Sequence, residues 1–420
     1  MKKYFLNLLL VMLIIFFFGS NILTTEAFGE VSEKIEKEIT FNGSLGAVML
    51  YDKDGEKRMY YEFSLNPEIA FWKLGMGLSL FMHWNDAGLR KEDYDKSNDI
   101  ANIIRYIRYD EKGAHPVYFR IGKLDEATLG HGFILGDYRN ELKNEFSKRV
   151  LGCELDLNLE KMGLETIAND IANPRVFGGR VYIYPFKIIN VTMPLLNKLT
   201  LGITYCADKN PDPDNTGENS LVVYGLDASL PIIKNILIIY GDIAEIKDNG
   251  NGSAIGVMGN RKAGLMPIFL GYKFEYRAIE KNFSPGTFDA LYEMIRPPQL
   301  SNEDLKGYYG ELSMSMLETI EFTMGYEDYE KNEPTISGKL SIDDKWTQKI
   351  LKKKISASAT YYQTNAKDVF SITNPNTLIT YEIKYGISEN ITMVYTTKQT
   401  YKIDNKTPIR NTSLFTYISF

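Results

Sequence analysis

The chain has 420 residues, of which 24% are charged, and its formal net charge is −6. This weak acidity argues against a nucleic-acid-binding protein, since the sequence holds no long basic run beyond Lys352-Lys353-Lys354. Twenty-eight Tyr and 22 Phe form a heavy aromatic load beside three His and two Cys. No zinc spacing of His and Cys, phosphate-binding glycine loop or nucleophile elbow is present, so we predict no enzyme, metal site or cofactor.

The N-terminus opens with Met-Lys-Lys and continues with an apolar run, Phe5 to Phe18, which Asn7 interrupts. Thr25 and Ala27 then occupy the two positions that a signal peptidase reads. The pattern predicts a signal peptide over residues 1–27 that is removed on export. The alternative is a retained anchor, but the run is short against the roughly 20 apolar residues that a membrane-spanning helix needs.

Alternation of apolar and polar residues with a period of two recurs through the rest of the chain, and no later apolar run is long enough for a membrane-spanning helix. In the stretch 268–278, one face carries Ile268, Leu270, Tyr272, Phe274, Tyr276 and Ala278, and the other carries Gly271, Lys273, Glu275 and Arg277. Several such stretches run to about ten residues, the length that crosses a bilayer when a strand is tilted. Soluble sandwich strands are usually shorter, at about 5–6 residues. The pattern predicts an all-β, closed antiparallel transmembrane β-barrel.

The connections between these stretches alternate in length. Long polar connections fall at 85–100, 208–220, 280–305 and 364–378. A walk along the chain predicts upward strands that begin near 41, 74, 116, 162, 199, 235, 267, 319, 353 and 389. Downward strands are predicted to begin near 59, 102, 147, 177, 219, 252, 306, 334, 378 and 410. The count is about 18–20 strands, with 102–110, 252–260 and 334–342 the weakest assignments, and all four long loops share one side.

This walk divides the chain into three parts. Residues 1–27 are the signal peptide, 28–40 a short periplasmic N-terminal segment and 41–420 the barrel. Both ends of the mature chain then lie in the periplasm.

The last strand carries a family resemblance. Leu414, Ile418 and the terminal Phe420 alternate as apolar or aromatic residues. This ending resembles the insertion signal of porin-like bacterial outer-membrane β-barrel proteins, although the glycine often found near the position of Phe415 is missing. The segment from Gly122 to Phe133 resembles a motif of uncharacterised barrel proteins from diderm bacteria. The resemblance implies location in the bacterial outer membrane and recognition of Leu414, Ile418 and Phe420 by the barrel-assembly machinery.

Charged residues on the polar face are the candidate functional residues. The predicted pore-lining set is Arg120, Glu154, Asp156, Lys273, Glu275, Arg277, Glu311, Glu321 and Glu382. Because rings of side-chain charge bias which ions pass a pore, the acidic excess suggests a mild preference for cations. The alternative is that these charges only solvate a wide lumen.

Several segments leave open questions. Segments 124–146 and 280–305 either narrow the pore or form outward loops, and the outward reading is favoured for 280–305. His131, between two glycines, is interpreted as a loop histidine with a local hydrogen bond. The segment 186–198 is interpreted as an interfacial turn or helix on the periplasmic rim. Cys153 falls on the apolar face and Cys206 on the polar face, so we predict two unpaired thiols.

The function predicted from these patterns is a porin-type channel for passive diffusion of small polar solutes or ions. The alternative is a plugged outer-membrane barrel that acts in binding or adhesion. The expected partners are outer-membrane lipid, the barrel-assembly machinery and small solutes, with no nucleic acid. Assembly as a homo-oligomer is left open.

Overall fold

The structure is a computed structural model that describes most of the chain beyond residue 36. The described residues are 37–51, 57–93, 103–113, 115–140, 150–212, 220–262, 268–293, 296–317, 319–364, 366, 377–401 and 408–419. The predicted signal peptide over 1–27, residues 28–36 and the terminal Phe420 therefore lie outside the described part.

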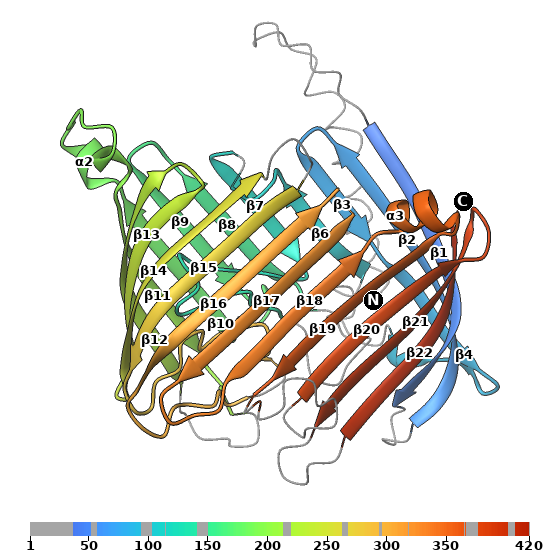
Figure 1. The fold of residues 1–420 in the computed structure, drawn as a ribbon. Coiled ribbons are helices and arrows are strands. Elements are labelled where there is room, and N and C mark those ends of the chain that lie inside the picture. Colours follow the sequence, from blue (N-terminus) through green and yellow to red (C-terminus); the bar gives the residue numbers. More distant parts are fainter. Residues whose placement is uncertain are drawn as a thin grey trace, which may run out of the picture.

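Strands dominate this part of the chain (Figure 1). Their bounds are β1 Lys37–Tyr51, β2 Lys57–Phe71, β3 Leu74–Leu78, β4 Leu80–Asn85, β5 Gly88–Leu89, β6 Ile104–Tyr109, β7 Val117–Gly122, β8 Gly152–Asn158, β9 Met162–Ala168, β10 Val176–Ile183, β11 Thr200–Asp208, β12 Leu221–Ile233, β13 Leu237–Ile246, β14 Asn251–Lys262, β15 Ile268–Ile279, β16 Leu305–Met316, β17 Ile320–Tyr329, β18 Thr335–Ile342, β19 Ile355–Gln363, β20 Thr377–Gly386, β21 Ile391–Tyr401 and β22 Pro408–Ser419.

The helices are short. They are η2 Lys91–Asp93, α2 Pro185–Ile188, η4 Leu196–Lys198 and α3 Asp344–Leu351. Within the described residues, none of the helices has the length and apolar character needed to cross a membrane.

The strands form one closed antiparallel sheet. Strands pair with their neighbours along the chain, except that β3 pairs with β6, and β1 pairs with β22, for example through Gly43 and Ile418, which closes the barrel. β3 and β4 both pair with β2 on either side of Ser79, so they act as one interrupted strand, and the two-residue β5 only extends β4. The 22 named strands of the described part therefore make a barrel of twenty. The predicted fold class is confirmed, including the three weak assignments, which correspond to β6, β14 and β18.

The predicted strand starts agree closely with the observed ones. The largest shifts are at β8, which begins at Gly152 and not near 147, and at β1, which begins at Lys37, inside the segment predicted to precede the barrel. Because strands alternate in direction, the connections after β4, β11, β15 and β19 all leave the same end of the barrel. We call this the long-loop end and the opposite end, where β1 begins and β22 finishes, the short-turn end.

The two faces of the wall differ in the way the alternation predicts. On β15, Phe274 and Tyr276 are exposed on the outer face, while Glu275 and Arg277 are buried on the inner face. The strand register carries this division round the whole barrel, since paired residues of antiparallel neighbours point to the same side. Large exposed outer residues include Ile203, Leu226, Ile243, Ile255, Leu312 and Met324. An apolar outer band of this kind is the surface that lipid covers in a transmembrane barrel.

Tyrosines mark the edge of this band toward the long-loop end. The exposed outer tyrosines there are Tyr61, Tyr205, Tyr224, Tyr276, Tyr308 and Tyr326. Such a girdle is typical of the interface between lipid and water, where an aromatic ring can be half apolar and half hydrated.

The two cysteines lie on opposite faces, as predicted. Cys206 is fully buried on the inner face of β11, and Cys153 lies on the outer face of β8; both are free thiols.

Candidate functional site: a loop-filled barrel interior

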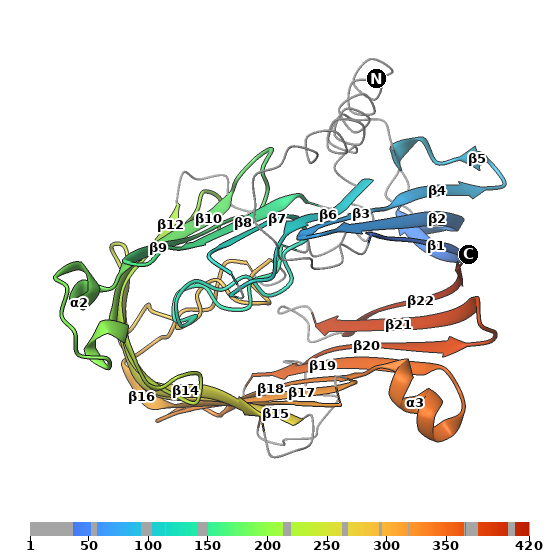
Figure 2. The same cartoon turned by 90° about the horizontal axis from the view of Figure 1, so that it is seen from above.

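Two connections from the long-loop end fold into the barrel. One is the segment 123–140 after β7, and the other is the segment 280–304 after β15. They lie inside the ring of strands when the barrel is viewed along its axis (Figure 2). A bridge between Leu135 and Phe288 joins them to each other, which makes them one inner layer. The outward reading of 280–305 is therefore wrong for the residues that the structure describes.

Glycines allow the segment 123–140 to turn sharply inside this space. Gly130 and Gly132 adopt positive φ angles of 57° and 81°, a region that side chains with a Cβ rarely occupy. A Cβ on Gly136 would lie 2.9 Å from the carbonyl oxygen of Gly132, so the backbone there passes too close for a larger residue. The turn brings Ala127 opposite Tyr138 in an antiparallel bridge.

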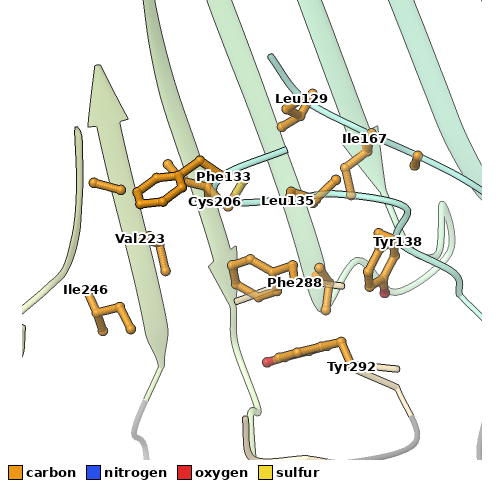
Figure 3. Close-up of a cluster of buried hydrophobic side chains, with 14 of the residues drawn as sticks. Leu129, Phe133, Leu135, Tyr138, Ile167, Cys206, Val223, Ile246, Phe288 and Tyr292 are labelled. Carbon is orange, nitrogen blue, oxygen red and sulfur yellow. The ribbon is translucent and has the colours of Figure 1, made fainter. Parts of the chain in front are cut away.

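An apolar cluster holds the two segments against the wall (Figure 3). Its fully buried members from the segments include Leu124, Leu135, Tyr138, Phe283 and Phe288, and those from the wall include Val176, Cys206 and Val223. Burial of each large apolar side chain stabilises the docked position by about 1.5–3 kcal/mol. This interior is packed like the core of a soluble protein, and that packing fixes where the segments lie.

A buried polar network secures the same segments near the long-loop end. Arg175, just before β10, donates to the carboxylates of Asp208 at 2.6 Å and Glu293 at 2.5 Å. The hydroxyl of Tyr138 donates to Glu293 at 2.5 Å, and that of Tyr292 donates to Asp208 at 2.7 Å. Arg175 thus bridges two buried carboxylates from different parts of the chain, Arg296 adds a second positive charge 3.6 Å from Glu293, and each carboxylate also accepts a tyrosine bond. Sequence reasoning missed these residues because nothing local links positions so far apart.

His131 lies deeper in the barrel. Its Nδ1 is 3.1 Å from Oδ1 of Asp242 on β13, and its ring stacks on Tyr240 at a centroid distance of 4.3 Å. The ammonium group of Lys273 donates to the His131 carbonyl at 2.6 Å. The expected local hydrogen bond is therefore wrong as to its partner, because the wall supplies it. These contacts give His131 a role in positioning the segment.

Burial raises the pKa of two carboxyl groups on the inner segments. It raises the pKa of Asp289 to about 6. Burial, and next the negative charge of Glu311, also raise the pKa of Asp137. Both groups lie in the loop segments and not in a membrane-spanning strand, so their titration acts on the docked segments.

The strand register puts all nine predicted pore-lining residues on the inner face. Several are engaged in ion pairs with the wall itself. Glu275 is 3% exposed and contacts both Lys273 and Arg277, and Arg277 also reaches Glu327 at 2.7 Å. These groups are therefore held by partners on β15 and β17.

The remaining members of the set are distributed round the wall. Glu154 and Asp156 on β8 face Lys112, at 2.6 and 3.6 Å. Arg120 donates through Nε to the carbonyl of Lys123 at 2.9 Å, at the start of the inner segment. Glu311 accepts from Tyr309 at 2.8 Å. Glu321 is exposed, and Glu382 pairs with Lys384 at 2.9 Å.

Charged groups inside the barrel remain open to solvent in places. Lys339 on the inner face of β18 pairs with Glu126 of the inner segment, and their side chains are 41% and 56% exposed. Arg105 of β6 pairs with Glu68 of β2, and these side chains are 32% and 38% exposed. The interior therefore contains water-accessible charge beside the apolar cluster.

A second buried cluster lies on β2 and β4. His83 bonds to Asp93 through Nδ1 at 2.9 Å and to Glu62 through Nε2 at 2.8 Å, and Arg90 contacts the other oxygen of Asp93 at 2.6 Å. In the described part of the chain, no group of three or more His, Cys, Asp or Glu residues is placed to hold a metal ion. The cluster joins the connection after β4 to the inner face.

The predicted insertion signal lies on β22. Leu414 points outward and is exposed, as the alternation requires. Ile418 is opposite Gly43 of β1 and Ile391 of β21, at the seam that closes the barrel. Phe420 falls outside the described residues.

The fold and its two faces define the class: a β-barrel of the kind found in bacterial outer membranes, with a polar, partly loop-filled interior. No protein-family model and no curated protein matches the chain.

Solved structures of porins resemble it at low identity. A BenF-like porin from Pseudomonas fluorescens Pf-5 is 10% identical, with 92% of this chain and 99% of that chain covered and a TM-score of 0.39. OccK1 (OpdK) from Pseudomonas aeruginosa is also 10% identical, with 93% and 100% covered and a TM-score of 0.36. OccK2 (OpdF) from the same organism, solved in complex with glucuronate, is 10% identical, with 92% and 99% covered and a TM-score of 0.38.

Proposed function

We propose that this protein is an outer-membrane channel for passive diffusion of small polar solutes or ions, narrowed by its own inner segments. Barrels of about 16–18 strands already enclose an aqueous channel, and this one has more. The observation that carries the proposal is the water-accessible charge inside the barrel, above all the exposed pair of Lys339 and Glu126. A lumen closed throughout by packing would bury such a pair.

The proposed pore-lining residues remain Arg120, Glu154, Asp156, Lys273, Glu275, Arg277, Glu311, Glu321 and Glu382. The ion pairs described above divide this set by role. Residues such as Glu275 and Arg277 act mainly as anchors of the wall, because their charges are mutually compensated. Glu321 is exposed, and the pairs of Glu382 with Lys384 and of Arg120 with Asp125 are open to solvent, so these three residues are better placed to act on a passing ion. The interaction of Leu414, Ile418 and Phe420 with the barrel-assembly machinery belongs to the same proposal.

Conductance in a planar lipid bilayer tests the function directly. The mature protein, folded and purified in detergent, should insert and give steady stepwise currents in concentrated potassium chloride. Vesicle swelling with neutral sugars, amino acids and organic acids of increasing size then measures which solutes pass. A folded barrel that inserts without any current would refute the proposal.

The second candidate is a plugged barrel that acts in binding or adhesion. The apolar cluster of Leu135, Phe283 and Phe288 favours it, because solvent-free packing inside a lumen resembles a plug. The two functions differ in the same bilayer measurement, where the plugged barrel is silent until its inner segments are loosened.

A further inference from the structure

Two connections at the short-turn end differ from their neighbours. Turns such as 72–73 and 234–236 there are tight, whereas 184–199 carries α2 and η4, and 343–354 carries α3. Both of these connections project outward from the barrel wall at the same end (Figures 1 and 2). We call them the rim projections.

The orientation of α3 is fixed by polar contacts to its own strand. Asp343 caps the helix by accepting a bond from the backbone N–H of Lys345 at 2.8 Å. The hydroxyl of Thr347 is buried against β19 and donates to the carbonyl of Ile355 at 2.6 Å. Ile350 and Leu351 are left on the free side, with 57% and 54% of their surface exposed. The helix therefore presents apolar side chains away from the barrel.

The first rim projection has the same character. Its exposed apolar residues are Ile188, Ile189, Met193 and Leu195. They continue the outer apolar surface of the adjoining strands, where Val181 of β10 and Leu201 of β11 are also exposed. The projection thus extends the lipid-facing band at its short-turn edge.

Positive charge accompanies the apolar residues on both projections. Segment 184–199 contains two lysines and no acidic residue, a net charge of +2. Segment 343–354 contains five lysines and two aspartates, a net charge of +3, in a chain whose total is −6. Within the described part of the chain, no carboxylate forms an ion pair with Lys345, Lys349 or Lys352. Their charges are thus available to a partner.

We propose that the rim projections bind the anionic phospholipid headgroups of the leaflet at the short-turn end. Apolar side chains enter the boundary between headgroups and acyl chains, while lysines on long stems reach the phosphates. Basic residues next to a membrane are attracted to acidic lipid, and this attraction weakens with salt. The inference requires a membrane-embedded barrel but not the channel function, so it stays testable in a protein that conducts no current.

Trp346 on α3 supplies a local probe. The chain has three tryptophans, and Trp72→Phe with Trp84→Phe leaves only Trp346. This variant is reconstituted in vesicles that contain brominated phosphatidylglycerol or, separately, brominated phosphatidylcholine, and quenching of Trp346 fluorescence is measured. We expect apparent association with phosphatidylglycerol to be roughly fivefold or more stronger at low salt, because several lysines act together. High salt should remove most of this preference.

Variants of the lysines separate charge from burial. Lys345→Gln with Lys349→Gln should bring the two lipids to nearly equal quenching. The matched control, Lys247→Gln with Lys331→Gln at the long-loop end, should keep the preference. Equal quenching by both lipids in the parent, a preference that salt does not reduce, or no quenching by either lipid would overturn the inference. The salt series on the parent decides the matter even if a lysine variant fails to fold.

Discussion

Two regions of the inner wall have opposite character. Toward the long-loop end of β9 to β13, the inner residues are mainly apolar and buried: Ile167, Val176, Cys206, Val223, Ala244 and Ile246. On β18 to β20, the inner residues are mainly hydroxylated or charged: Ser337, Lys339, Ser341, Ser356, Ser358, Thr360, Thr380, Glu382 and Lys384. The first region lies under the inner segments, and the second is partly exposed.

The two regions of the barrel wall therefore have different roles. Where a segment docks, the wall supplies apolar surface and a few charges that are fully paired, as in a soluble core. Where the wall is in contact with solvent, its hydroxyl groups form hydrogen bonds with water and add no charge to the lumen. In the proposed channel, the docked region sets how much of the lumen is open, and the hydroxyl-rich region is the better candidate for the passage itself.

The largest expected effect comes from a charge in the apolar cluster. Leu135→Asp with Phe288→Asp should expel the inner segments, because an unpaired buried carboxylate is strongly unfavourable. Single-channel conductance should rise roughly two- to threefold, toward that of an open barrel of this strand number. Ser341→Asp, a charge of the same kind on the hydroxyl-rich region, should change conductance far less. Equal conductance of the double variant and the wild type would contradict the conclusion that the docked region limits the open lumen.

Removal of Arg175 should have the next largest effect. Arg175→Ala leaves Asp208 buried without its counter-charge and leaves Glu293 with only Arg296, whose Nε lies 3.6 Å away, at a cost of about 3–5 kcal/mol. Amide hydrogen exchange over 283–293 should become faster and the channel current noisier. Glu293→Gln in the same protein should restore part of the protection, since it removes one of the two carboxylates that lost Arg175. Lys384→Ala, which loses only an exposed pair on β20, serves as the control and should leave exchange unchanged.

Acid should tighten the docked segments. Burial raises the pKa of Asp289 from its ordinary 3.8 to about 6, so the docked segment binds a proton that the released segment does not. Docking therefore gains stability as the pH falls through about 6, and the gain is complete near the ordinary value. Conductance should fall between pH 7.5 and pH 5, and Asp289→Asn should reduce this dependence. A pH response that Asp289→Asn leaves intact would assign it to another group, with Asp137 the first to test.

The smallest expected effect concerns ion selectivity. Glu321→Gln with Glu382→Gln removes two negative charges from the inner face, and the reversal potential in a potassium chloride gradient should move slightly toward anions. Screening by salt limits the shift, since both side chains are in contact with solvent. Glu275→Gln is not a matched test, because Glu275 is buried and its charge is compensated by both Lys273 and Arg277. A wild-type channel that selects anions would contradict the predicted mild cation preference.

Most of the wall could be predicted from the sequence, because strand alternation is a local property. Phe274 and Tyr276 against Glu275 and Arg277 show the period of two within a few residues. Register and strand number follow, since a slip of one residue would turn every side chain to the wrong face. The opposite faces of Cys153 and Cys206 were predictable for the same reason.

The inner segments could not be placed in this way. Segment 280–304 has the length and composition of an outer loop, and only its partners draw it inward. Those partners are distant in sequence: Arg175 and Glu293 are 118 residues apart, and His131 and Asp242 are 111 apart. The helix α3 was also missed, because a run of lysines beside a strand has no clear period.

The sequence by itself thus determined a closed barrel with an apolar outer face and a polar inner face, since both follow from alternation along each strand. Only the tertiary structure decided that two long connections turn into the barrel and that a few residues in or next to the wall, above all Arg175 and Asp242, hold them there. The physical reason is that docking depends on complementary shape and paired charge between segments that are distant in sequence. Neither property can be deduced from the residues adjacent to one position in the chain. How far the lumen stays open depends on that docking.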